Sequence, residues 1–161
     1  MSAMKKSLLI LFVISMLGMT GGNPYAEMIR HGMIMTTKGR VEVKLKDSAW
    51  KPAEAGMTLY ENDEVRTGKE STAKILIDEN GNTGQLDLKP ESQLRMGGLE
   101  LDRVTGDKTT ILDLAVGKVL VHAEKLKGNS RFQVRTPNST TGVRGTTFLV
   151  DASAAKPSKN A

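Results

Sequence analysis

Residues 72–88, TAKILIDENGNTGQLDL, contain the pattern that decides the fold of this chain. Apolar side chains occupy every second position from Ala73 to Ile77, and Leu86 and Leu88 repeat that spacing. A period of two is typical of a β-strand with one face in a core. Asn80-Gly81 lies between the two runs, and this dipeptide is favoured where both residues of a tight hairpin turn need positive φ. The stretch therefore predicts a β-hairpin.

The same alternation recurs in both directions along the chain. Turn-forming residues such as Pro90, Gly117 and Pro137 separate the runs. Many short strands at regular spacing predict an all-β sandwich, barrel or solenoid. The Leu-Asp-Leu pieces at 86–88 and 112–114 would fit stacked rungs of a solenoid. The further alternating runs lie at 41–45, 94–96, 99–101, 112–116, 119–123, 132–136 and 148–150.

The two ends of the chain have a different composition. Residues 1–26 combine Lys5 and Lys6 with an apolar run and small residues, which predicts a secretory signal peptide cleaved after Gly22 or Ala26. The apolar run is shorter than the roughly 20 residues of a membrane span, so no transmembrane protein is expected after cleavage. For residues 27–38, the sequence allows either a leading strand or a spacer. Residues 152–161 are expected to be a disordered tail.

Charge and cysteine content exclude several classes of protein. The chain has 23 basic and 18 acidic residues, but four of the lysines fall in the signal region and the tail. The domain between them is nearly neutral, which argues against nucleic-acid binding. The chain has no cysteine, so disulfides and cysteine-based metal sites are excluded.

Few residues have the types and spacing that catalysis requires. The only histidines are His31 and His122, and His122 is expected on the solvent face of a strand. A calcium loop starting at Asp78 would lack the required glycine and final acid, so a turn is the better interpretation. Glu61, Asp63 and Glu64 form an acidic cluster without a partner histidine nearby. We therefore expect no enzyme, no metal and no cofactor, with a hydrolase as the least favoured alternative.

Two longer motifs are more specific. Residues 50–68 read WKPAEAGMTLYENDEVRTG, and residues 132–150 read FQVRTPNSTTGVRGTTFLV. Together they resemble the FecR family, whose pattern has a Trp, a Gly-Asp before a VRTG strand, and a closing TP…VRGT. The resemblance covers about 39–151, the expected β domain. Asn62 stands where the family usually has Gly, and Asn adopts the left-handed conformation readily, so the turn is expected to survive.

The resemblance implies an all-β fold, either two twisted sheets or a solenoid-like stack of short strands. Trp50 is expected to lie across the end of the core, and the side chains of Arg66 and Arg144 are expected to bind carboxylates or loop carbonyls. The family-motif positions are expected to serve packing and loop closure rather than to form a ligand site. These positions are Trp50, Gly56, Leu59, Asp63, Arg66, Thr67, Gly68, Thr136, Pro137, Val143, Arg144, Gly145, Thr146 and Phe148.

The resemblance also implies the cell envelope, with a periplasmic or secreted location. The best-known relatives regulate signalling from the membrane and have a cytoplasmic region before their membrane-spanning helix. Only five or six residues precede the apolar segment here, so we do not expect such a cytoplasmic region. We expect an exported module that binds or scaffolds a partner protein. The alternative is a cell-wall or polysaccharide binder that uses Trp50 and Tyr60 as stacking rings.

Overall fold

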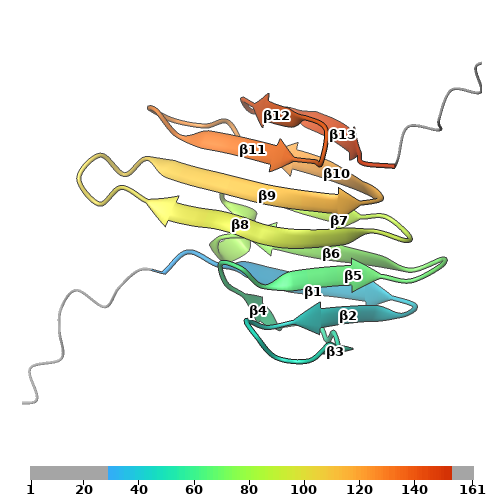
Figure 1. The fold of residues 1–161 in the computed structure, drawn as a ribbon. Coiled ribbons are helices and arrows are strands. Elements are labelled where there is room, and N and C mark those ends of the chain that lie inside the picture. Colours follow the sequence, from blue (N-terminus) through green and yellow to red (C-terminus); the bar gives the residue numbers. More distant parts are fainter. Residues whose placement is uncertain (1–28, 154–161) are drawn as a thin grey trace, which may run out of the picture.

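The computed structural model describes residues 29–153, which form two open β-sheets packed face to face (Figure 1). The predicted signal peptide lies outside the described residues, and so does the tail from residue 154 onward. Among residues 29–153, no helix has the length and hydropathy needed to cross a membrane. The all-β prediction is confirmed, and of the two arrangements expected, the structure has two sheets.

The six-stranded sheet contains the predicted hairpin at its centre. Its strand order is β13 (Thr147–Asp151), β10 (Lys118–Ala123), β7 (Gly84–Leu88), β6 (Thr72–Ile77), β1 (Gly32–Lys38) and β4 (Thr58–Leu59). Every neighbouring pair in this sheet is antiparallel. Residues 32–38 form an inner strand of this sheet, so of the two alternatives that the sequence allowed for this segment, the structure has the strand.

The seven-stranded sheet covers the other side of the core. Its order is β12 (Thr140–Val143), β11 (Arg131–Arg135), β9 (Lys108–Val116), β8 (Gln93–Leu101), β5 (Glu64–Thr67), β2 (Val41–Lys44) and β3 (Lys51–Pro52). The pairing of β9 with β11 is parallel, because β10 between them in the chain belongs to the opposite sheet. Leu86–Leu88 and Leu112–Leu114 lie in opposite sheets, so they are not neighbouring rungs of a solenoid.

The core lies between the sheets and consists mainly of the alternating side chains that the sequence predicted, joined by Ile34, Leu59 and Val65 from outside the predicted runs. Aliphatic residues dominate it, and within residues 29–153 the only aromatic ring among the fully buried side chains is that of Phe132. Burying apolar surface of this kind contributes about 25 cal/mol per Å² to folding. The fully buried members include Ile34, Val43, Ile75, Ile77, Leu86, Leu88, Leu94, Met96, Leu112, Leu114 and Val134.

The connection between β6 and β7 differs from the predicted two-residue turn. It runs from Asp78 to Thr83 and contains the 3₁₀ turn Glu79–Gly81, with Gly81 at φ 71°. The hairpin opens because the Asp78 side chain turns inward to bind residues from elsewhere in the chain. A tertiary interaction thus overrides the local preference of Asn-Gly for a tight turn.

Candidate functional site

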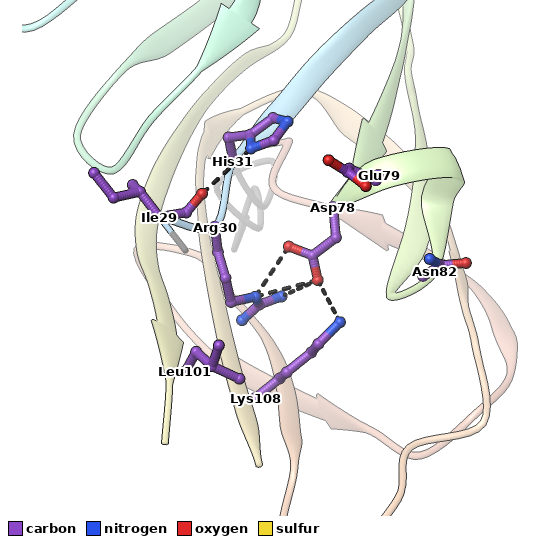
Figure 2. Close-up of a pocket in the computed structure, with 8 residues that line it drawn as sticks. All are labelled: Ile29, Arg30, His31, Asp78, Glu79, Asn82, Leu101 and Lys108. Atoms are coloured by element: carbon purple, nitrogen blue, oxygen red, sulfur yellow. Dashed lines mark hydrogen bonds and ion pairs between the residues drawn. The ribbon is translucent and has the colours of Figure 1, made fainter. Parts of the chain in front are cut away.

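The strongest cluster of buried charge links the two sheets at one end of the sandwich (Figure 2). Arg30 is 6% exposed, and its guanidinium donates to both carboxylate oxygens of Asp78, with Nε–Oδ1 and Nη2–Oδ2 distances of 3.0 Å. Its remaining donors reach the carbonyl oxygens of Glu100 and Thr109 at 2.9 Å and the Thr110 hydroxyl at 2.8 Å. Asp78 follows β6, whereas the other acceptors lie on β8 and β9, so one side chain joins the two sheets.

The carboxylate of Asp78 is held by more than one cation. Lys108 Nζ donates to Oδ2 at 2.8 Å, and the Thr83 hydroxyl donates to the same oxygen. Burial alone would raise the pKa of the Asp78 carboxyl, but the bonds from Arg30, Lys108 and Thr83 outweigh it and lower that pKa. Asp78 also has φ 62° and ψ 171°, a region of backbone conformation that is normally restricted to glycine and costs about 1–3 kcal/mol.

A pocket of about 300 Å³ opens beside this cluster. Figure 2 shows Asp78 between Arg30 and Lys108, while His31, Glu79 and Asn82 line the pocket further out. Both cations are paired with the Asp78 carboxylate, and every Arg30 nitrogen already has an acceptor. The cluster is therefore a structural clamp between the sheets. Sequence analysis did not find it, because its members are 48 or more residues away from Arg30 in the chain.

The acidic cluster of the sequence is divided between the interior, which holds Asp63, and the surface, which holds Glu61 and Glu64. Asp63 is 2% exposed and accepts the backbone N–H groups of Lys46 at 2.8 Å and Tyr60 at 2.7 Å. Glu64 accepts from Gln93 at 2.6 Å and lies 3.7 Å from Lys44 Nζ, whereas Glu61 is exposed. Glu61 and Glu64 line one open pocket together with Lys44 and Arg95, whereas the buried Asp63 is bound to backbone N–H groups and does not line it. The structure therefore gives no support to the hydrolase alternative.

Trp50 is not placed across the end of the core. Its ring lies over the guanidinium of Arg66, which is 4.2 Å from the ring centroid. Arg66 lies between the buried Val65 and Thr67 on β5, so it points to the outer face of the seven-stranded sheet, and it donates to Glu42 at 2.9 Å. The prediction for Trp50 is wrong because a cation on the outer face offers it a stacking partner. Arg66 does bind a carboxylate, as expected.

The other positions of the first motif close turns or fill the core. The buried Thr67 hydroxyl donates to the Lys89 carbonyl at 2.6 Å, and the Gly68 N–H donates to Arg40 at 2.8 Å. Leu59 is fully buried. Gly56 has φ 88°, and its backbone N–H donates to the Ile34 carbonyl oxygen at 2.7 Å. Asn62 has φ 72°, which confirms that it takes the left-handed conformation expected there.

The second motif, in contrast, lies mainly at the surface. Its residues form the β11–β12 hairpin, β13 and the connection between them (Figure 1). Pro137 is exposed in the hairpin turn, where the Thr136 hydroxyl accepts the N–H of Ser139 at 3.0 Å. Arg144 and Thr146 are exposed, and Val143 is partly buried. Phe148 packs against the margin of the core.

Gly145→Val is expected to lower the free energy of unfolding by about 1–3 kcal/mol, because Gly145 has φ 64° and side chains are strained in that region. A Cβ atom there would also lie 3.0 Å from the Lys125 backbone. Urea denaturation of the variant measures the loss. Gly142→Val is the matched control, since a Cβ at Gly142 meets open space. Equal stability of the two variants would contradict a structural role for Gly145.

The edges of the two sheets are not equivalent. On one side the sheets end in β3, which consists of Lys51 and Pro52, and in β4, which has only two residues. Short edge strands with lysine or proline discourage pairing with other chains. On the other side they end in β12 and β13, which contain neither lysine nor proline. Among residues 29–153, no further strand pairs with β12 or β13. We call this side the open edge.

The hydrogen-bond register identifies the free backbone groups of the open edge. The Thr136 N–H donates to Ser139 at 2.8 Å, which makes these opposite residues a hydrogen-bonded pair of the β11–β12 ladder. Such pairs alternate along an antiparallel ladder, so Thr140 and Gly142 point their N–H and C=O groups away from the sheet. In the β10–β13 ladder, the Ala123 N–H donates to the Thr146 carbonyl oxygen, so these two residues form a hydrogen-bonded pair. By the same alternation, the N–H and C=O groups of Thr147 and Leu149 point outward from β13.

These features define a small all-β domain of two open sheets with one unprotected edge. The family model described as FecR protein matches residues 63–159, more than half of the chain, so the chain belongs to the FecR family. This confirms the resemblance predicted from the motifs and indicates a family of signalling-related envelope proteins. Neither the curated proteins nor the solved structures compared with the chain gave a match.

Proposed function

We propose that this chain is an exported, non-catalytic module that binds a partner protein of the cell envelope at its open edge. The observation that carries the proposal is the difference between the two sides of the sandwich. Lysine, proline and very short strands protect one side, whereas β12 and β13 present outward backbone groups on the other. An extended segment of a partner would add to such an edge through main-chain hydrogen bonds.

The location is part of the same proposal. The signal-like composition of residues 1–26 supports export, and membership of the FecR family supports the envelope. The nearly neutral domain, with most outward-facing charges on its sheets paired, supports a protein partner rather than a nucleic acid.

The cell-wall alternative receives no support from the positions of the aromatic rings. One face of Trp50 is occupied by Arg66, and the ring partner of Tyr60 is His31, with centroids 6.2 Å apart. A polysaccharide platform needs neighbouring rings with free faces, and these two rings lie in different environments.

Photo-cross-linking in intact cells tests the proposal. A photoreactive residue replaces Leu149, which is 56% exposed on β13, or Lys51 on the protected edge. We expect a discrete protein adduct from position 149, none from position 51, and loss of the adduct in a chain that also carries Gly142→Pro and Phe148→Pro. Gly142→Pro removes an outward N–H, and Phe148→Pro disrupts the edge strand itself. Equal adducts from both edges, or no adduct from position 149, would overturn the proposal.

A further inference from the structure

Two arginines lie at the open end of the β11–β12 hairpin, next to its last cross-strand pair. The register sets Phe132 opposite Val143, and its continuation by one residue sets Arg131 opposite Arg144. Both side chains are exposed, and both residues line one pocket of about 270 Å³. Like charges directly opposite one another destabilise a strand pair. The hairpin therefore carries an electrostatic cost at the open edge.

The other arginines on the outer face of this sheet are paired with carboxylates. Arg66 donates to Glu42 at 2.9 Å, and Arg95 and Arg135 donate to opposite sides of Asp113 at 2.7 and 2.6 Å. Asp113 fits there because Gly97, beside it, has no side chain. Within residues 29–153, no carboxylate pairs with Arg131 or Arg144, and Arg144 Nη2 approaches the Gly128 carbonyl oxygen at 3.5 Å.

The surroundings of the two arginines are open; they include lysines on the neighbouring loop and the Asp107 carboxylate, whose oxygens accept the N–H groups of Asn129 on the pocket wall. Gly142 forms part of the pocket wall, and a Cβ atom built on it would meet nothing within 4 Å. Lys125 and Lys127 lie on the neighbouring exposed loop, where the backbone of Lys125 packs against Gly145. Guanidinium groups match carboxylates in planar, two-point hydrogen bonding. This end of the open edge is thus complementary to a carboxylate.

We propose that the partner contributes an extended acidic segment, which adds to β12 and places an Asp or Glu carboxylate beside Arg144 at the end of this edge strand, where it also offsets the charge of Arg131 on the next strand. This inference rests on the proposed function and names the chemistry of its partner. Thr140 and Gly142 supply the outward backbone groups, and side chains of an added strand project on the arginine face at every second residue. The carboxylate relieves the repulsion between the two arginines when the segment binds.

The test uses the full chain and synthetic peptides of about nine residues, in which threonine alternates with Glu, Gln or Lys. Affinities are measured by fluorescence anisotropy and positions by NMR chemical shifts. We expect the Glu peptide to bind about tenfold tighter than the Gln peptide, because hydrogen bonds between charged groups are stronger than neutral ones. The shifts are expected at Gly142 and Arg144, and high salt is expected to reduce the preference.

Two sets of variants make the result specific. Arg131→Gln with Arg144→Gln is expected to abolish the preference for Glu, whereas Lys38→Gln with Lys69→Gln removes two exposed cations elsewhere and is expected to leave it unchanged. Gly142→Pro is expected to weaken the Glu peptide about tenfold, because main-chain pairing is lost. Unchanged binding to this last variant would overturn strand addition.

Two other outcomes would overturn the acidic partner. One is equal binding of the Glu and Gln peptides. The other is that the chain binds none of the peptides but binds phosphatidylglycerol vesicles, and that this binding depends on Arg131 and Arg144. That result would mean that the two arginines bind lipid headgroups. If position 149 still gives its adduct in cells in either case, the proposed function stands and only the acidic chemistry of the partner falls.

Discussion

Arg30→Met is expected to lower the free energy of unfolding by about 3–5 kcal/mol, the usual cost of removing one member of a buried ion pair. The variant leaves the Asp78 carboxylate without its main partner, leaves the Thr110 hydroxyl without that donor, and removes the bonds from Arg30 to the carbonyl oxygens of Glu100 and Thr109. It also removes the side chain that joins the two sheets. Urea denaturation followed by circular dichroism measures the loss.

Lys108→Met is the matched control for this prediction. Lys108 binds the same carboxylate, but its side chain is 33% exposed, so the loss is expected to be about 1 kcal/mol or less. Adding Asp78→Asn to Arg30→Met is expected to restore part of the stability, because it removes the buried carboxylate and leaves only the Lys108 ammonium, whose side chain is 33% exposed. Equal losses for Arg30→Met and Lys108→Met would show that Arg30 is not the centre of the clamp.

The clamp also predicts a dependence of stability on pH. The pKa of Asp78 is lower in the folded chain than its ordinary value, so its stabilising contribution is complete above about pH 4 and is lost as the pH falls through the lower folded pKa. Arg30→Met is expected to flatten this part of the profile, since it removes the main partner of the carboxylate. If the fall in stability at acidic pH were the same in Arg30→Met, carboxylates other than Asp78 would be responsible for it.

Phe132→Ala is expected to cost about 3–5 kcal/mol, because Phe132 is the largest fully buried side chain and its removal leaves a cavity between the sheets. Its ring reaches the backbone of Gly84 in the opposite sheet, where an added Cβ would lie 3.4 Å from it. The core around it is made of strands on both sides and cannot collapse freely into the space.

Phe148→Ala removes the same atoms at the margin of the core and serves as the control. Phe148 is only partly buried at the open edge, so a smaller loss of about 1–2 kcal/mol is expected. The comparison is made by urea denaturation of both variants under the same conditions. A loss for Phe148→Ala as large as that for Phe132→Ala would mean that β13 belongs to the centre of the core rather than to its edge.

The difference between these two phenylalanines could not be predicted from the sequence. Both occupy alternating positions in strands of the same motif, and periodicity assigns them equally to an inner face. Burial also depends on how many strands lie beyond a residue in its sheet. Phe132 lies one strand inside the edge, whereas Phe148 lies on the edge strand itself.

The open edge could be predicted only in part. The contrast between Lys51-Pro52 and the uncharged residues 139–143 is visible in the sequence. That both lie on edge strands, and that Arg131 and Arg144 lie together at the end of one hairpin, follows from strand order and hairpin register. Trp50 was placed wrongly for a similar reason, since its partner Arg66 belongs to a different strand.

The sequence by itself determined the all-β class, the alternating core, the family and the left-handed turn at Asn62, because each depends on local periodicity or on motifs read in order. Only the tertiary structure decided the buried clamp, the edge strands and the two arginines at the hairpin end. These features join residues far apart in the chain, such as Arg30 and Thr110, which are separated by 80 positions. Local patterns predict pairing of strands that follow one another in the chain, such as β6 and β7, but not the order of distant strands, because that order is set by packing of the whole domain.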